Sequence, residues 1–241
     1  MTWRIRAAAL NGNTYFTSNR GILKSESSSA VLSPAGMPRC LDLVLTLTGA
    51  PGTLLTDTGS SPTAGANQAR SYRGIWCKRD ANNNLIVGPP SSRFTVVNTA
   101  GAVRDTSVVT NLPPEITTSH FLMLVASEIV DFGDTVDPGD ELATIFEYFP
   151  TSTDITNGYV TIVDNVPDTF RGAQCYTNDS QEGIAQANAR PPLARDICAY
   201  RRRLLVANYT EPHKMNLQML GTTGITAGMT ITIGGVVYTA A

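Results

Sequence analysis

The chain has 241 residues and a formal net charge of −2 at pH 7, so no overall positive field points to nucleic-acid binding. Only 16% of its residues are charged, which is below the roughly 25% of an ordinary soluble domain, and Thr, Ser, Asn, Gly and Pro take their place. This composition predicts many short strands joined by turns. We find no 18-residue apolar stretch, secretory signal or lipidation motif, and therefore expect no membrane association.

Residues 1–48 predict a series of strands, which we expect to be propeller-like. The dipeptide Asn11-Gly12 is typical of a tight turn, and residues 14–25 predict a hairpin that turns at Asn19-Arg20-Gly21. From residue 41 to residue 48 every second position is leucine, and Val44 is the only large apolar residue between them. This period of two predicts a strand with one buried face.

Residues 49–67 consist mainly of Gly, Ala, Pro, Ser and Thr, with little apolar bulk. We interpret them as a linker or a long surface loop. A domain boundary is therefore expected here.

Residues 68–177 predict an antiparallel sandwich, because about seven strand-like runs within roughly 100 residues is the density of an immunoglobulin-like fold. The runs are residues 72–78, 84–87, 94–97, 106–110, 121–126, 141–149 and 159–163. The first is apolar on both faces and is expected to be central. Gly88-Pro89-Pro90 is expected to lie outside any sheet. Residues 141–149 fit both helical and strand periods, but their Phe, Tyr and Ile content favours a strand.

Residues 178–241 predict further propeller-like strands. Residues 197–208 are either a strand pair or one long strand, and residues 215–220 form another apolar run. Two β-rich runs flank Gly234-Gly235, which is typical of a two-residue hairpin.

These segments resemble parts of a known family. The segment 72–90 (YRGIWCKRDANNNLIVGPP) resembles the opening hairpin of fibronectin type III-like modules in bacteriophage tail proteins. The rest of such a module is similar to three later segments, residues 121–127, 141–148 and 159–168 (YVTIVDNVPD). Similar to β-propeller blade strands are residues 13–25 (NTYFTSNRGILKS) and 199–220 (AYRRRLLVANYTEPHKMNLQML). Together they resemble a tail nozzle or tubular protein of a short-tailed phage.

This resemblance implies an all-β fold in which a fibronectin- or immunoglobulin-like sandwich is inserted between β-propeller-like strands. It implies a virion structural protein, made in the host cytoplasm and located in the tail. Copies of the chain would form a ring, a homohexamer, that contacts other tail proteins and lets DNA pass without sequence-specific binding. A complete propeller needs about four or more blades, and about two blade-like pieces occur here. Either the chain is part of a longer protein or the flanks are not blades.

The candidate metal site is an acidic loop in which aspartates recur every three residues: Asp131, Asp134, Asp137 and Asp140. A flexible loop of this kind can supply the several oxygen ligands that Ca²⁺ takes. The spacing differs from that of an EF-hand. The alternative is a solvated loop whose charges keep a sheet edge from pairing with other chains. We expect no other cofactor.

Arg201, Arg202 and Arg203 form the only basic cluster. If they lay in one strand, Arg201 and Arg203 would face one way and Arg202 the other. The cluster predicts a contact with a neighbouring subunit or with phosphates of DNA. The alternative is a solvent-exposed strand face with local ion pairs. Non-specific DNA binding usually neutralises more phosphates than three arginines can, about 6–10.

No catalytic signature is found, and we do not expect an enzyme. His120 and His213 are the only histidines and are interpreted as structural. The cysteines are far apart and predict mostly buried, reduced thiols more than a disulfide or metal set. They are Cys40, Cys77, Cys175 and Cys198.

Two functions of other classes stay open. A carbohydrate-binding adhesion module of a tail fibre would need exposed aromatic side chains, and the candidates, which alternation places mostly inside sheets, are Tyr15, Trp76, Tyr148, Phe149 and Tyr159. A tail-associated glycan hydrolase would need an acid–base pair in a cleft, formed by Asp164, Asp168 or the acidic loop. The sequence between Asp164 and Asp168 predicts a turn first.

Overall fold

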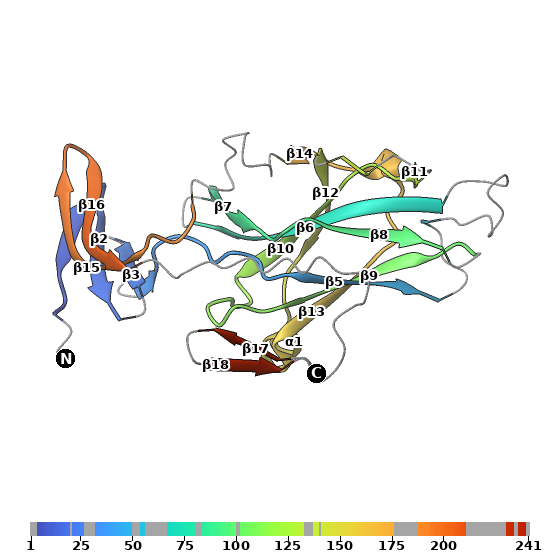
Figure 1. Cartoon of the computed structure of the whole chain (residues 1–241). Helices are drawn as coiled ribbons and strands as arrows, with labels where there is room; N and C mark the ends of the chain where they lie inside the picture. Colours follow the sequence, from blue (N-terminus) through green and yellow to red (C-terminus); the bar gives the residue numbers. More distant parts are fainter. Residues whose placement is uncertain are drawn as a thin grey trace. The chain divides into compact units, whose positions relative to one another are not determined.

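The computed structural model describes residues 4–19, 21–26, 32–49, 54–55, 67–80, 83–99, 102–132, 137–139, 141–175, 188–210, 230–233 and 236–239. Over these residues the protein is mostly β, with antiparallel sheets, one of which curls, and with very little helix (Figure 1). The chain forms two compact units, Met1–Thr210 and Glu211–Ala241.

The first strands form an antiparallel four-stranded sheet in chain order. They are β1 (Ala7–Leu10), β2 (Asn13–Ser18), β3 (Gly21–Glu26) and β4 (Leu32–Pro34). β1 and β2 are joined by Asn11 and Gly12, whose φ angles of 50° and 74° are left-handed values that Asn and Gly tolerate best. The predicted tight turn and the predicted hairpin over residues 14–25 are confirmed.

A two-stranded ribbon from much later in the chain packs against this sheet. Its strands are β15 (Leu193–Tyr200) and β16 (Arg203–Thr210), so residues 197–208 belong to a strand pair and not to one long strand. The side chains buried between ribbon and sheet are Ile22, Ala35, Ala194 and Ile197. We call the described residues of 4–35 and 188–210 the flanking body, because segments far apart in sequence share this small core (Figure 1).

Between the two parts of the flanking body, the chain forms two antiparallel sheets that share one core, and we call these two sheets the sandwich. The larger is a curled seven-stranded sheet centred on β6 (Asn67–Arg79). Its other strands are β7 (Leu85–Pro90), β8 (Phe94–Asn98), β10 (His120–Ala126), β11 (Val130–Phe132), β12 (Leu142–Tyr148) and β14 (Gln174–Cys175). β6 buries Tyr72 and Trp76 in one hydrophobic cluster and Ile75 and Cys77 in another. Its predicted central position is confirmed.

A three-stranded sheet forms the second layer of the sandwich, in the order β13-β9-β5. Its strands are β5 (Leu43–Thr48), β9 (Asp105–Asn111) and β13 (Tyr159–Asp164). Leu43 is buried against Tyr72 and Trp76 in the main core, whereas Val44 is 62% exposed. The half-buried strand predicted at residues 41–48 is therefore confirmed from residue 43 onward, and it pairs within the sandwich.

The double proline of β7 departs from expectation. We expected Gly88-Pro89-Pro90 to lie outside any sheet, and this is wrong, because β7 continues to Pro90, which lies opposite Ile75 of β6. A register shift between Ile75 and Cys77 accommodates the prolines. The described residues show β7 paired with β6 alone, and a strand that pairs on one side tolerates proline because it needs no donor on the other.

Two short helices were not predicted, α1 (Ser152–Asn157) and η1 (Asp168–Phe170). α1 begins with a capping box, in which Thr151 accepts from the backbone N–H of Asp154 and the Asp154 carboxylate accepts from the backbone N–H of Thr151. It ends at Gly158, whose φ of 77° suits a left-handed cap.

The unit Glu211–Ala241 contains the antiparallel hairpin of β17 (Thr230–Ile233) and β18 (Val236–Thr239). The hairpin predicted around Gly234-Gly235 is confirmed. The apolar run at residues 215–220 lies outside the described residues. The domain limits at 49–67 and 177–178 stay predictions, because most of residues 50–66 and 176–187 lie outside them too.

Gly74 of β6 leaves no space for a side chain between the two sheets. A Cβ atom there would lie 2.7 Å from the Cys40 sulfur and 3.2 Å and 3.3 Å from side-chain carbons of Leu43 and Leu122. We expect Gly74→Ala to lower the free energy of unfolding by about 1–3 kcal/mol through overpacking. Denaturant titration measures this, with Gly49→Ala as the control, since no atom lies within 4 Å of a Cβ there. Equal stabilities of the two variants would contradict the packing described.

Candidate functional site

A buried ion pair between Arg70 of β6 and Asp164 of β13 joins the two sheets of the sandwich. Both side chains are fully buried, and Nη1 of Arg70 donates to Oδ2 of Asp164 over 3.2 Å. Arg70 also donates from Nε to the Ser127 carbonyl (3.1 Å) and from Nη1 to the Val166 carbonyl (3.0 Å). The guanidinium thus has partners from two separate segments, one at the end of β10 and one at the end of β13.

Asp164 accepts two further hydrogen bonds. The Tyr72 hydroxyl donates over 2.8 Å and the Val166 backbone N–H over 3.0 Å. Burial raises the pKa of the Asp164 carboxyl, and the Arg70 charge opposes this rise. Burial, followed by the charge of Asp164, raises the pKa of the Tyr72 hydroxyl well above its usual value, so that it remains a donor. A carboxylate with these partners and no exposed surface cannot contact a substrate.

The charges continue outward from this pair through Asp168 and Arg171. Oδ1 of Asp168 lies 3.3 Å from Nη2 of Arg70 and 3.7 Å from Nε of Arg171, and Oδ2 accepts from the Ile129 backbone N–H over 2.8 Å. Arg171 pairs in turn with Glu128, over 2.6 Å, near the surface. Alternating charges therefore extend from the core to the rim of a pocket.

That pocket has a volume of about 460 Å³ and is lined by Ser127, Glu128, Val130, Gly139, Glu141, Ala143, Asp168, Arg171, Gly172 and Gln174. Asp168 and Glu128 each face an arginine. Asp164 is not among the lining residues. The pair expected of a glycan hydrolase is therefore divided, with Asp168 at the pocket and Asp164 sealed in the core.

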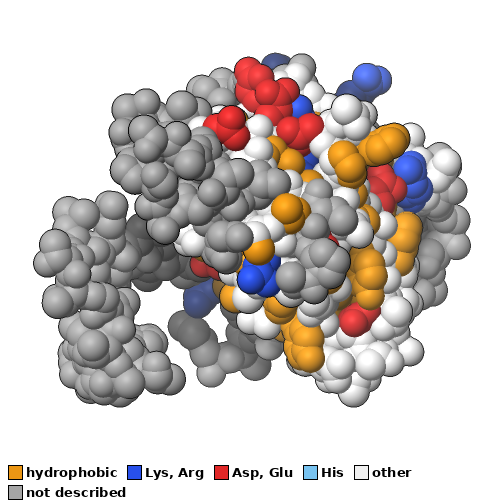
Figure 2. Space-filling view, turned by 90° about the vertical axis from the view of Figure 1, so that its right-hand side faces the viewer, with side chains coloured by type: hydrophobic (Ala, Val, Ile, Leu, Met, Phe, Trp, Pro, Cys, Tyr) orange, Lys and Arg blue, Asp and Glu red, His pale blue; other side chains and the backbone are white. Residues whose placement is uncertain are grey.

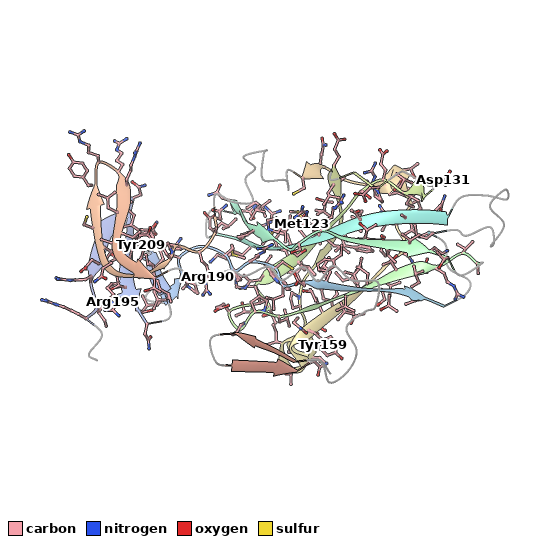
Figure 3. The ribbon with its side chains drawn as sticks, viewed as in Figure 1. Met123, Asp131, Tyr159, Arg190, Arg195 and Tyr209 are labelled. Atoms are coloured by element: carbon pink, nitrogen blue, oxygen red, sulfur yellow. The ribbon has the colours of Figure 1, made fainter. Side chains whose placement is uncertain are left out.

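The acidic loop is only partly described. Asp131 accepts from the Gln68 side-chain amide over 3.1 Å (Figure 3), and Asp137 pairs with Arg93 over 2.6 Å. Asp134 and Asp140 lie outside the described residues. Within the described part of the chain, no three acidic, histidine or cysteine side chains come together as a metal site. The calcium site stays a prediction.

The basic cluster lies at the tip of the β15–β16 ribbon. Arg201 and Arg202 form the turn, with positive φ angles of 47° and 60°, and Arg203 begins β16. The expected alternation of the three arginines within one strand is wrong, because the chain reverses between Tyr200 and Arg203, which lie opposite each other. All three arginines are exposed.

The five aromatic residues considered for glycan stacking do not form one platform. Trp76 is fully buried in the core. The Tyr148 hydroxyl donates to the Asp154 carboxylate over 2.9 Å. Phe149 is largely exposed but packs against Phe121, with ring centroids 5.1 Å apart. Tyr159 is exposed on β13 (Figure 3), whereas Tyr15 packs against the core of the flanking body.

The four cysteines are free, and burial raises the pKa of the Cys40 and Cys77 thiols to about 12, so both are unreactive at neutral pH. Cys175 is half-buried and Cys198 is exposed. His120 is held locally, since its Nδ1 accepts from the Thr117 backbone N–H over 3.1 Å. His213 lies outside the described residues.

Sequence reasoning did not identify Arg70. Arg70 lies between Ala69 and Ser71, two residues before the predicted strand at residues 72–78, so the prediction did not place it in a strand. Its carboxylate partner lies 94 positions away, so no local spacing could reveal the pair.

Removal of Arg70 should be costly. Arg70→Met leaves the Asp164 carboxylate buried without its cation, and we expect a loss of about 3–5 kcal/mol in the free energy of unfolding. The matched control is Arg93→Met, which breaks the exposed pair with Asp137 and should cost no more than about 1 kcal/mol. Denaturant unfolding of both variants measures the difference. Similar losses in the free energy of unfolding would show that the buried pair stabilises the fold no more than the exposed pair does.

His120 should make stability depend on pH. Burial, and then the charge of Lys78, lower the pKa of His120, so the folded state holds its proton less tightly than the unfolded state does. The stability that comes from keeping His120 neutral is fully present above its pKa in the unfolded state, about 6.5. It is lost as the pH falls through the lowered pKa that His120 has in the folded state. The melting temperature should fall more between pH 7.5 and 5 (round values spanning about 6.5) in the native protein than in His120→Gln. An identical pH dependence in both proteins would exclude this role.

No known protein family, curated protein or solved structure matches the chain. None of the helices in the described residues is long and apolar enough to cross a membrane.

Proposed function

We propose that the chain is a structural protein of a virion, a tail nozzle or tubular component that forms a ring through which DNA is ejected. The insertion of the sandwich into the flanking body carries this proposal. The chain leaves the flanking body after β4 and returns to it at β15, with the sandwich strands from β5 to β14 in between. A fibronectin type III-like module inserted between propeller-like strands would have this order.

The flanking body itself supports the propeller-like part of the proposal. Four antiparallel strands connected in chain order, as in β1–β4, are the form of a propeller blade. The β15–β16 ribbon supplies two strands of a second blade. These two pieces do not close a ring within the described residues, so a propeller needs further blades of the same kind packed beside them.

The outer face of the three-stranded sheet is the surface that we assign to contacts between copies. Val44 is 62% exposed, Val163 46% and Tyr159 44%, and register places Thr46, Ser107, Val109 and Thr161 beside them. Asp105 is the only charged residue on this face of the three strands. Interfaces between identical chains have such apolar, charge-poor centres. Hydrophobic side chains also reach the surface on the side shown in Figure 2.

The buried charges favour assembly over catalysis. Asp164 and Asp168, the carboxylates suited by spacing to hydrolysis, are engaged by Arg70 and Arg171. Many weak contacts in closed symmetry give a stable particle without any reacting group. A glycan-binding module is less well supported, because the exposed aromatic rings do not share one face.

Light scattering coupled to size exclusion tests the proposal. The native protein should elute as one defined assembly of several copies. Val44→Lys combined with Val163→Lys should give smaller species with unchanged circular dichroism, because each lysine would have to lose its hydration in the interface. Leu85→Lys, an exposed apolar position on β7, is the matched control and should keep the assembly. A monomeric native protein would contradict the proposal.

A further inference from the structure

The turn of the β15–β16 ribbon is built from residues that do not suit it. Arg201 and Arg202 both have left-handed φ angles, 47° and 60°, in a two-residue hairpin turn that favours Asn-Gly. The same chain uses Asn11-Gly12 for the left-handed turn between β1 and β2. Residues held in a disfavoured conformation are concentrated at functional sites. The side chains of Arg201 and Arg202 are therefore candidates for a function that offsets the strain.

These arginines are available for an external ligand. Arg201, Arg202 and Arg203 are exposed, and none of them faces a carboxylate among the described residues. The Arg201 guanidinium lies over the ring of Tyr200, 5.2 Å from its centroid. This contact orients one guanidinium and leaves its edge N–H groups free to donate. In Figure 3, side chains with nitrogen ends project from the far end of the ribbon.

Positive charge is concentrated in the flanking body. Its described residues contain seven arginines and one lysine, but only two acidic residues, Glu26 and Asp196. The whole chain has a net charge of −2, so the rest of the protein is acidic. Arg6 is the partner of Asp196, over 3.5 Å. Arg190 is also paired, with Glu115 over 3.0 Å. The described residues of the flanking body therefore have an excess of positive charge, although the protein as a whole does not.

We infer that the tip of the β15–β16 ribbon, residues 200–203, binds the phosphodiester backbone of a nucleic acid without reading its sequence. Guanidinium groups match phosphate oxygens through pairs of parallel hydrogen bonds. Tyr200, which is exposed at the tip and contacts Arg201, can stack on an unpaired base. The inference deepens the proposed function and rests on it only for the choice of nucleic acid as the polyanion.

One copy of the tip should bind weakly. Three arginines neutralise about three phosphates, which gives a slope of about −2 to −3 for the logarithm of the binding constant against the logarithm of salt concentration. In an assembly, several tips would act together on one strand, and their combined affinity would exceed that of a single tip.

The test uses the full chain and the double variant Arg201→Asn, Arg202→Gly. This variant gives the turn its preferred residues, so its melting temperature should stay the same or rise while binding is lost. Fluorescence anisotropy with labelled random-sequence DNA, single-stranded and duplex, measures binding over a salt series. We expect the native protein to bind with the stated slope, and the variant to bind at least about tenfold more weakly, as follows from losing two phosphate contacts.

The control variant is Arg39→Gln with Arg79→Gln, which removes the same charge from exposed positions of the sandwich and should retain binding. The inference is overturned if the native protein binds neither DNA at low salt, if it binds heparin alone, or if the turn variant binds as tightly as the native protein. An equal loss in the control would also overturn it. DNA binding by a monomeric protein would contradict the ring and leave the inference standing.

Discussion

The sandwich depends on a buried salt bridge between Arg70 and Asp164. Each ion loses its hydration inside the protein, at a cost of several kcal/mol. This cost is offset by the hydrogen bonds that Arg70 donates from Nε and Nη1 and by those that Asp164 accepts, whereas Nη2 of Arg70 makes no hydrogen bond to the described residues and lies 3.3 Å from the Asp168 carboxylate. Arg70 contacts the end of β10 through Ser127 and the segment after β13 through Val166, while Tyr72 fixes Asp164 from the same strand as Arg70. One cation thus sets how the two sheets meet.

The same network holds two of the carboxylates at the surface pocket. Asp168 and Arg171 extend the network to a surface pocket, but as members of ion pairs that brace the loops after β10 and β13. The surfaces that remain for function are of other kinds, an apolar sheet face in the sandwich and a basic ribbon in the flanking body. We propose that the first contacts other copies of the chain and that the second contacts a nucleic-acid backbone.

Strands with a clear period of two were predictable, because alternate burial leaves a local record in the sequence. The leucines of β5, the alternation of β13 and the Asn11-Gly12 turn are examples. Long-range partners leave no such record. The spacing of Asp131 and Asp137 predicts a shared cation, and this stays a prediction. It gave no sign that Gln68 of β6 contacts Asp131 or that Arg93, just before β8, contacts Asp137. The Arg201-Arg202 turn was not predicted, because arginine is disfavoured in such a turn. The place of the β7 prolines in a sheet was not predicted either, because the sequence does not show which strand lies at a sheet edge.

We propose that this protein acts by assembling with copies of itself around a channel. Electron microscopy of the purified native chain tests it most directly, through class averages viewed along the assembly axis. We expect closed particles with rotational symmetry and an open centre. Uniform single-copy particles, at concentrations where the protein is folded, would contradict it.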